Sequence, residues 1–489
     1  MSKKVIVIGA GLGGLATSAL LAKEGYQVKV LEKNSLPGGR AQIYQAEGFT
    51  YDMGPSWYLM PDAFEIFFSQ FGKKPSDYYQ LIKLDPSYQV LFEDGDKFIV
   101  RPDIEYMAAK FEEYEPGAGA TFRKHMQLME RKYKLGVPKF LLKEFKSPFE
   151  FLTKEVFQNL FNLQIEQSYH QTIAKKFKHP KLQQILEFMV VFLGGSPYRV
   201  PGLYNLINWA DFGLGVYYPQ GGFFAVVKGM EKLAIEQGVQ FKYNEEVREI
   251  LVENGVAQKV VTASAEYEAD IVIGYADYVH IESQLLKAEY RSYPNKYWQK
   301  ADLAPSGLCF YLGLNQKVEG LLHHTLVFNN QWREHFKSVE EGLNPERPQY
   351  YLSAPSKTDP NVAPAGMENL FVLVPTASGL LDTAEYREKI FNYVIDDINS
   401  KLKLDIKPLI IHKRAYWIND FAKDYNAYKG NAFGLGHTLK HSLFFRPKNR
   451  SKKVKNLFYT GQFTNPGTGT PLVVLSGIVV RDLIKKYGF

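Results

Sequence analysis

The stretch Val5-Ile-Val-Ile8-Gly9-Ala-Gly11-Leu-Gly13-Gly14 decides the fold of this chain. Its first four residues are all apolar and β-branched, which predicts a short, buried parallel strand. Residues Leu15 to Glu24 follow with a helical pattern that stops at Gly25, and Tyr26–Leu31 alternates like a second strand. This order of strand, glycine loop, helix and strand predicts a βαβ unit of the Rossmann kind.

The glycines of this loop predict a dinucleotide-binding site. Gly9 permits a tight turn, Gly11 lets the backbone approach a pyrophosphate, and Gly14, next to Gly13, lets the helix pack closely on the strand. The start of the helix offers unpaired N–H groups and a partial positive charge to the phosphates. Glu32 closes the second strand, where its carboxylate can accept hydrogen bonds from a ribose. The alternative, a glycine-rich turn that binds nothing, does not account for the strand, helix and acid around it.

The residues after Glu32 favour FAD over NAD. Lys33-Asn-Ser-Leu-Pro37-Gly38-Gly39-Arg40 resembles the extended flavoprotein fingerprint, in which an acid is followed closely by Gly-Gly-Arg. The glycines allow a second close approach, and Arg40 can pair with phosphate as a planar fork. We therefore expect Lys33, Gly39 and Arg40 at the cofactor; the alternative for Arg40 is a surface position.

Three later segments extend the expected FAD site. Gly54-Pro55-Ser56 forms a sharp loop that passes near the flavin in the resembling flavoproteins. Gly222 opens another helix, and Val247 begins one of the apolar strands with which the nucleotide domain resumes.

The end of the chain predicts a second helix start at the cofactor. A strand at 456–460 leads into a turn at Gly461, and Gly469-Thr470-Pro471-Leu472 opens the last helix. Thr470 suits the N-cap and Pro471 the first helical position. The dipole of this helix can stabilise the anion that forms on flavin reduction.

The chain has 489 residues, too many for a single compact core. We expect an α/β fold, α+β as a whole, with a discontinuous Rossmann-like FAD-binding domain in residues 1–75, 218–285 and 450–489. Residues 76–105 and 286–449 are expected to form a mixed-sheet substrate domain. A helical, membrane-facing insertion is expected at 106–217.

Composition excludes several classes of protein. The net charge of +7 is spread through Lys-rich helices rather than gathered in one arm, which argues against nucleic-acid binding. The single cysteine, Cys309, fits a reducing compartment. We predict no signal peptide and no transmembrane helix, because apolar runs are too short.

Two amphipathic stretches predict contact with a membrane surface. Val137–Lys146 and Pro148–Phe161 place Phe and Leu at helical spacing with Lys between them. That composition is typical of a helix lying in a bilayer interface. The alternative is an amphipathic helix that packs on the protein's own core.

Together with the N-terminal fingerprint, six later blocks resemble the bacterial phytoene-desaturase-type carotenoid oxidoreductases. These blocks are Asp52–Pro55, Tyr218–Gly222, His323–Thr325, Asn426–Phe433, Phe445–Arg450 and Asn465–Pro471. The resemblance covers nearly the whole chain. It implies FAD-dependent desaturation of a linear, acyclic C40-type carotenoid, either of the phytoene or lycopene type or as 1-hydroxycarotenoid 3,4-desaturation. It also implies a lipid-dissolved substrate and peripheral attachment to the cytoplasmic side of a membrane.

The chemistry expected of such an enzyme removes two vicinal hydrogens. One leaves as hydride to the flavin and the other as a proton, and oxygen or a quinone then takes the electrons. His170, which stands where many members of the family have an Arg, is the candidate catalytic residue, with Glu166 and Asp211 as neighbouring candidates. No metal site is expected, because HExxH motifs, Cys pairs and carboxylate clusters are lacking.

Two other functions stay open at this point. One is a flavin oxidase of the amine-oxidase or protoporphyrinogen-oxidase kind, which would share the N-terminal fingerprint. The other is a flavin-binding membrane scaffold without catalysis. The blocks after residue 320 argue against the first, and the helix starts at both ends of the flavin argue against the second.

Overall fold

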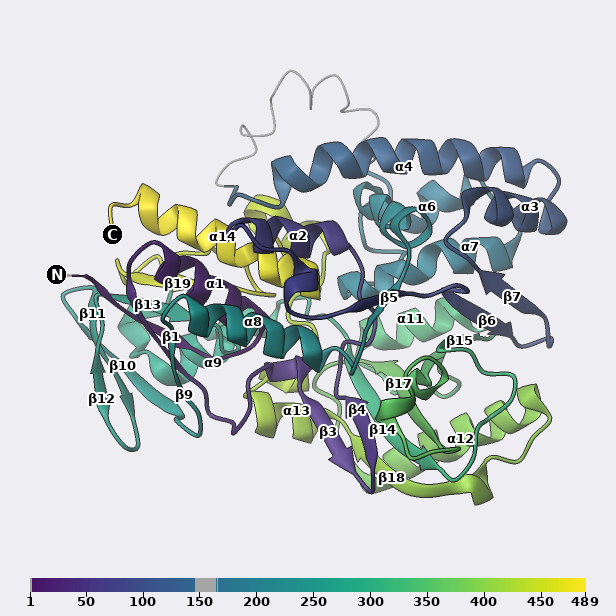
Figure 1. Ribbon diagram of the computed structural model, residues 1–489. Helices are drawn as coiled ribbons and strands as arrows, with labels where there is room; N and C mark the ends of the chain where they lie inside the picture. The colour runs from purple at the N-terminus through teal and green to yellow at the C-terminus, as the bar shows by residue number, and fades with distance from the viewer. Residues whose placement is uncertain (1, 146–163, 165) are drawn as a thin grey trace.

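The computed structural model describes residues 2–145, 164 and 166–489 and has a parallel sheet and a mixed sheet at its two ends (Figure 1). This arrangement confirms the expected α/β class with a Rossmann-like part and a mixed-sheet part. The predicted amphipathic stretch at 148–161 lies outside the described residues.

The first sheet is the predicted nucleotide-binding sheet, and all its neighbouring strands pair in parallel. In spatial order its strands are β19 (Leu457–Tyr459), β13 (Ile271–Gly274), β1 (Lys4–Ile8), β2 (Gln27–Leu31) and β9 (Gln240–Lys242).

Both faces of this sheet are covered, which explains why β1 is apolar at every position after Lys4. Val5 and Val7 point to one face and share a core with helix α1 (Leu12–Lys23). Ile6 and Ile8 point to the other face and pack with the antiparallel strands β10 (Val247–Glu253), β11 (Val256–Thr262) and β12 (Glu266–Glu268).

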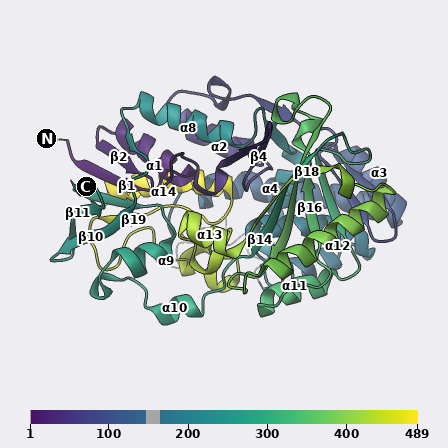
Figure 2. The ribbon, with the colours of Figure 1, turned by 90° about the horizontal axis from the view of Figure 1, so that it is seen from below.

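Further helices lie with α1 at this end of the molecule (Figures 1 and 2). They are α2 (Pro61–Ser69), α8 (Phe224–Glu236), α9 (Tyr278–His280), α10 (Asn295–Gln299) and α14 (Thr470–Lys486).

The second sheet has seven strands and is mixed. Among the strand pairs that the structure describes in it, β15 and β6 are parallel and all others are antiparallel. Its strands, in spatial order, are β18 (Ile410–Tyr416), β14 (Ser306–Leu314), β17 (Glu368–Thr376), β16 (Tyr350–Ser353), β15 (His324–Phe328), β6 (Tyr88–Phe92) and β7 (Lys97–Val100).

Alternation along β14 assigns the two faces of the mixed sheet. Leu308, Phe310 and Leu312 pack with helix α12 (Ala384–Leu402) on the outer face. Cys309 and Tyr311 belong to the main core on the inner face. Figure 2 shows α12 and α11 (Trp332–Glu341) along this sheet, and α13 (Ile418–Tyr425) between the two sheets.

The helical insertion covers the top of the molecule in Figure 1. Its described helices are α3 (Ile104–Tyr114), α4 (Ala118–Phe140), α6 (Tyr169–Ala174) and α7 (Pro180–Glu187). In the first predicted membrane stretch, Val137 is buried in the core and Leu141 and Leu142 pack partly against it. The described part of that stretch therefore favours packing on the protein's own core, and contact with a membrane stays a prediction.

The domain division stays a prediction, but the strands follow it closely. All strands of the parallel sheet fall within 1–75, 218–285 and 450–489, and all strands of the mixed sheet within 76–105 and 286–449. Two small antiparallel pairs accompany these sheets: the hairpin of β3 (Ile43–Ala46) and β4 (Phe49–Asp52), and β5 (Leu81–Lys83) with the distant strand β8 (Tyr217–Pro219). The hairpin is tied to the mixed sheet, where the Asn369 side chain donates to the Thr50 carbonyl at 2.7 Å.

Candidate functional site

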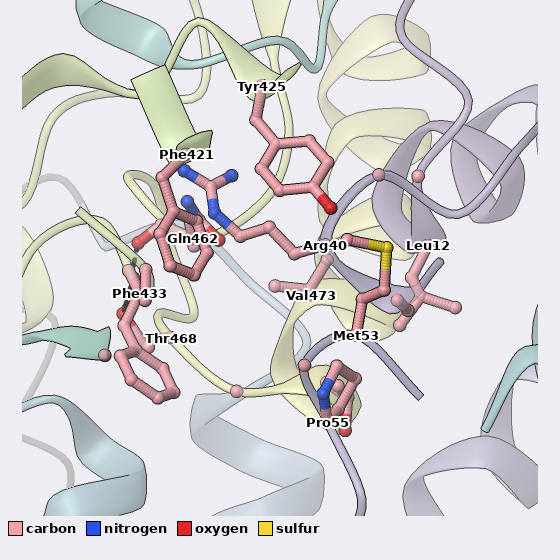
Figure 3. A pocket seen from close by; sticks show the side chains of 18 of the residues that line it. Leu12, Arg40, Met53, Pro55, Phe421, Tyr425, Phe433, Gln462, Thr468 and Val473 are labelled. Carbon is pink, nitrogen blue, oxygen red and sulfur yellow. Dashed lines mark hydrogen bonds between the residues drawn. The ribbon is translucent and has the colours of Figure 1, made fainter. Parts of the chain in front are cut away.

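A long pocket runs between the two sheets and is lined by both. Gly9, Glu32 and Val247 line it from the nucleotide-binding side, and Phe328 and Tyr351 line it from the mixed sheet. Figure 3 shows the part where Arg40 lies beside Tyr425 of α13, with Met53 and Pro55 further along the pocket. The pocket therefore joins the predicted cofactor site to a region built by distant segments.

The glycine loop has the tight geometry that its sequence predicts. Gly9 has a φ of +105°, and its N–H donates to the Leu31 carbonyl at 2.8 Å. A Cβ on Gly14 would lie 2.1 Å from the Gly9 carbonyl oxygen, so glycine is needed for α1 to pack on β1. Gly9 and Gly11 line the pocket, whereas Gly13 and Gly14 are not among its lining residues.

Glu32 lines the pocket at the end of β2, as predicted for a ribose ligand. One carboxylate oxygen accepts the N–H of Ala10 at 2.8 Å and the other accepts the N–H of Asn34 at 2.9 Å. Burial raises the pKa of Glu32, and these two backbone groups oppose the rise. Both oxygens are thus held in place beside the glycine loop.

Arg40 extends into the pocket rather than onto the surface (Figure 3). Its guanidinium donates to the Asn431 carbonyl at 3.1 Å and lies 3.9 Å from the Asp277 carboxylate. The Tyr425 ring centre is 5.7 Å from it. Its Nε is buried and has no hydrogen-bond partner among the described residues. An unpaired donor of this kind fits an anionic ligand such as a phosphate.

Lys33 and Gly39 also line the pocket. The Lys33 ammonium donates to the Lys423 carbonyl at 2.8 Å and to the Asn426 side chain at 3.0 Å. Lys33 therefore joins the end of β2 to α13, a contact that the local sequence pattern could not indicate.

Two backbone segments line the middle of the pocket, Gly54–Ser56 and Gly469–Leu472. The prediction that Thr470 is the N-cap of the last helix is wrong by one position. Gly469, with a φ of +113°, is the N-cap, and Thr470 and Pro471 are the first two helical residues. A positive φ is easily adopted by glycine, which lets the chain turn sharply into α14.

A buried polar group stands behind the Gly54–Ser56 loop. The Ser56 hydroxyl lies 2.8 Å from the Tyr351 hydroxyl, which lies 2.7 Å from Nδ1 of His324. The His324 ring stacks on Trp57, with 4.6 Å between ring centres. Burial lowers the pKa of His324 well below its ordinary value, so this histidine is neutral. His324 is thus part of a structural hydrogen-bonding chain, and its neighbour His323 contacts the Thr358 hydroxyl through Nδ1 at 2.7 Å.

Besides Gly13 and Gly14, two further predicted cofactor residues are not among those that line the pocket, Gly222 and Gly461. A Cβ on Gly222 would lie 2.8 Å from the Asp52 carboxylate, which accepts the N–H of Phe223 at 2.7 Å. Gly222 therefore lets Asp52 cap the start of α8. A Cβ on Gly461 would lie 2.6 Å from the Tyr275 ring, so this glycine makes room for an aromatic side chain of the pocket wall.

The three candidate catalytic residues do not line the pocket either. His170 pairs through Nδ1 with Glu187 at 2.7 Å, and Glu187 also accepts the indole N–H of Trp332 at 2.9 Å. His170 thus supports a pocket-lining tryptophan from behind, and its catalytic role stays a prediction. Asp211 is buried and accepts the Tyr88 hydroxyl at 2.7 Å, while Glu166 is exposed.

The part of the pocket away from the nucleotide sheet is strongly apolar. Its lining includes the aromatic residues Trp57, Phe188, Phe192, Phe328, Trp332 and Phe336. Several of them contact one another, such as Trp57 with Phe192 at 5.2 Å and Phe328 with Trp332 at 4.7 Å between ring centres. These side chains come from four separate segments, so their meeting depends on the tertiary fold.

Arg446 is a structural residue of the site that sequence reasoning did not single out. It is fully buried and donates to the carbonyl oxygens of His441, Leu435 and Gln462 at 2.8, 2.9 and 2.6 Å. A fourth bond joins it to the Thr468 hydroxyl at 3.1 Å. Arg446 thereby holds together the C-terminal loops that line the pocket, and the motif Phe445–Arg450 was the available signal.

Within the described ranges, no three His, Cys, Asp or Glu side chains are grouped so that they could hold a metal ion. The same part of the chain contains no helix long and apolar enough to cross a bilayer.

The lining residues fit FAD. A Cβ on Gly11 would occupy the space next to the start of α1, and the unpaired Arg40 Nε and the carboxylate of Glu32 lie along the same pocket. Gly39, Arg40 and the loop Gly54–Ser56 would hold the remainder of the cofactor.

Comparison with known proteins agrees with this geometry. The family described as flavin containing amine oxidoreductase matches residues 12–480. A carotenoid 3,4-desaturase from Haloarcula japonica is 44% identical over 97% of this chain and 96% of its own length. The chain belongs to the carotenoid desaturases of the flavin-containing amine oxidoreductase family. It is an FAD-dependent oxidoreductase.

Other relatives and structures are consistent with this membership. A zeta-carotene-forming phytoene desaturase from Myxococcus xanthus is 32% identical over 99% of this chain and 94% of its own length. Among solved structures, an oxidoreductase from Methanosarcina mazei has a TM-score of 0.64 at 16% identity, covering 98% of this chain and 100% of its own. A putrescine oxidase has a TM-score of 0.62 at 14% identity, covering 99% of both chains. At these identities the solved structures establish the shared fold alone.

Proposed function

We propose that this carotenoid desaturase introduces a carbon–carbon double bond at the 3,4-position of an acyclic C40-type carotenoid. The observation that carries the proposal is the apolar, aromatic-lined part of the pocket, which continues directly from the FAD-binding residues. The name of the Haloarcula japonica relative, a carotenoid 3,4-desaturase, supports the 3,4-position.

Burial supplies most of the substrate binding in this proposal. A polyene offers no charged group, so its affinity must come from about 25 cal/mol for each Å² of apolar surface removed from water. Trp57, Phe192 and Trp332 provide large apolar surfaces with defined positions. They would hold the chain of the substrate so that one C–H bond is presented to the cofactor.

The chain's own residues also orient the cofactor. Bound FAD supplies the hydride acceptor of the dehydrogenation. The loop Gly54–Ser56 is held by the hydrogen bond between the hydroxyls of Ser56 and Tyr351, and the helix start at Gly469–Leu472 presents backbone N–H groups to the pocket. The partial positive charge at this start favours negative charge nearby, as flavin reduction produces.

Product analysis tests the reaction. The purified protein with bound flavin would be mixed with liposomes that contain lycopene-type, phytoene-type or 1-hydroxylated carotenoids, and products would be read by mass and absorption spectra. We expect loss of two hydrogens from at least one acyclic carotenoid, with a longer chromophore. Bleaching of the flavin by putrescine-type amines, with no reaction on any carotenoid, would support the amine-oxidase alternative instead.

The electron acceptor is tested in the same system. We propose oxygen or a membrane quinone, because both reach a membrane-bound flavin. Anaerobic turnover that resumes on addition of a quinone would select the quinone, and turnover that resumes only with air would select oxygen.

We also propose that the protein attaches to the membrane surface from which its substrate comes. Leu135 of α4 is 49% exposed, and Leu439 and Phe445 are 53% and 56% exposed. The segment after Phe445 is bound to the end of the α4 region, where the N–H of Asn449 donates to Glu144 at 2.8 Å. Exposed apolar side chains on neighbouring segments are typical of an interfacial surface.

Co-sedimentation with liposomes tests the attachment. The double variant Leu439→Ser/Phe445→Ser should lower the bound fraction severalfold, because two exposed apolar groups are removed. Leu343→Ser/Leu381→Ser is the matched control, since these leucines are also exposed, at 54% and 79%, but belong to the mixed-sheet part. An equal loss of liposome binding in both double variants, or a loss in neither, would contradict the assignment of this surface as the membrane-binding one.

A further inference from the structure

The Tyr275 ring occupies the space that the glycine loop leaves open. Tyr275 follows β13 directly and lines the pocket. Its Cε1 lies 2.5 Å from the position of a Cβ on Gly11, and its Cε2 lies 2.4 Å from that of a Cβ on Gly13. The same ring also lies 2.6 Å from the position of a Cβ on Gly461. Three glycines from two segments thus enclose one aromatic side chain.

This space is where the cofactor's phosphates belong. Glycine at the second position of the loop lets the backbone approach a pyrophosphate, so the volume of an added Cβ at Gly11 is volume that the pyrophosphate uses. The ring stands in that volume. A tyrosine ring at this distance and a pyrophosphate in the family's position exclude each other sterically.

The Tyr275 hydroxyl also interacts with the polar groups that would otherwise bind a phosphate oxygen. Burial raises the pKa of Tyr275, while the backbone N–H of Gly13 and the charge of Arg40 act in the opposite direction. The N–H at the start of α1 and the Arg40 guanidinium are the groups expected to bind the phosphates. The phenol therefore competes for the hydrogen-bond donors as well as for the space.

Packing against the glycines and the N–H of Gly13 hold the ring in this position. Tyr275 is only partly buried and lines the pocket, and the movement that would take its ring away from the glycine loop is a rotation about the Cα–Cβ bond.

We propose that Tyr275 gates the phosphate end of the FAD site: its ring fills the pyrophosphate position and must rotate out before the dinucleotide can bind. Tyr275 thereby sets the rate and apparent affinity of flavin uptake, and it keeps the glycine loop covered until the cofactor arrives. If the ring covers the loop in about nine molecules of ten, the apparent Kd for FAD is about tenfold weaker than that of the open form.

Flavin rebinding tests the gate independently of catalysis. FAD would be removed from the purified holoprotein with a concentrated chaotropic salt, and rebinding would be followed by quenching of flavin fluorescence in a stopped-flow instrument. We expect Tyr275→Asn to take up FAD about tenfold faster than the wild type. Tyr275→Phe is the matched control, because it keeps the ring, and its rate should stay within about threefold of the wild type.

ADP is a second probe, because it carries the pyrophosphate without the flavin. Its Kd, measured by calorimetry, should tighten about tenfold in Tyr275→Asn and little in Tyr275→Phe. Unchanged or weaker binding of FAD and ADP in a folded Tyr275→Asn variant would overturn the proposal, because the ring would then be a ligand of the cofactor or stand clear of it. Thermal melting of the flavin-free variants checks that each is folded.

Discussion

The two ends of the pocket are built in different ways. At the nucleotide end, Gly9, Gly11 and Glu32 come from one continuous βαβ unit, and backbone N–H groups and one carboxylate make most of the site. At the apolar end, Trp57, Phe192 and Trp332 come from segments far apart in the chain, and side-chain surface makes most of the wall.

This difference separates cofactor binding from substrate selection. The backbone of a glycine loop suits any dinucleotide, so the nucleotide end is shared by flavoproteins with unrelated substrates. The apolar end has no such common geometry, and its shape depends on which aromatic residues each segment supplies. Substitutions at the two ends should therefore change different measured quantities.

The largest effect is expected at the glycine loop. Gly11→Val should lower the flavin-to-protein ratio of the purified protein by about tenfold or more, because its side chain would occupy the pyrophosphate position. The ratio is measured from the flavin absorbance and the protein concentration. Gly136→Ala of α4 is the control, since the atom nearest to an added Cβ there is 3.8 Å away and flavin content should be normal. A folded Gly11→Val variant with full flavin content would remove the loop from the cofactor site.

A smaller effect is expected at the apolar end, where a substitution should lower kcat/KM and leave the flavin content unchanged. Phe192→Ala should keep its full flavin content and lose about tenfold in kcat/KM toward the carotenoid, because about 1.5 kcal/mol of apolar burial is removed. Initial rates with liposome-delivered substrate measure this loss. Phe192 lines the pocket beside Trp57, whereas Leu343 is exposed elsewhere, so Leu343→Ala should leave both quantities unchanged. Loss of flavin in Phe192→Ala would break the separation between the two ends.

The smallest effect on flavin content and turnover is expected at the buried Asp211 behind the apolar end, where the measured quantity is stability. Burial raises the pKa of Asp211 to about 7, and the hydrogen bond from Tyr88 opposes the rise. Since the folded state holds this proton more tightly than the unfolded state, the free energy of unfolding should fall as pH rises from about 4 to about 7 and level off above that range. Asp211→Asn removes this titration and should flatten the profile.

Melting temperatures at closely spaced pH values measure this contribution. Asp482→Asn, at an exposed carboxylate, is the control and should keep the slope of the wild type. An identical pH profile in wild type and Asp211→Asn would show that Asp211 is ionised in the folded protein over the whole range.

Several residues of the site could be predicted because their roles depend on neighbours in the sequence. Gly9, Gly11 and Glu32 follow from the order of strand, loop, helix and strand, and the structure places all three along the pocket. Gly222 could not be assigned in this way, because a glycine with positive φ before a helix serves equally to admit a ligand or, as here, the Asp52 carboxylate. His170 illustrates the same limit. Its partner Glu187, and Trp332, which donates to Glu187, are not neighbours of His170 in the sequence.

The sequence by itself determined the fold class, the parallel sheet and the cofactor, because a βαβ unit and its fingerprint are encoded by consecutive residues and local backbone geometry. Only the tertiary structure decided which aromatic side chains line the pocket, that Arg446 joins its C-terminal loops, and that Tyr275 covers the glycine loop. Those features depend on contacts between residues that are not neighbours in the sequence, from 5 positions apart for Arg446 and His441 to more than 200 for Tyr275 and Gly11. Packing and burial, rather than local propensity, set the outcome there.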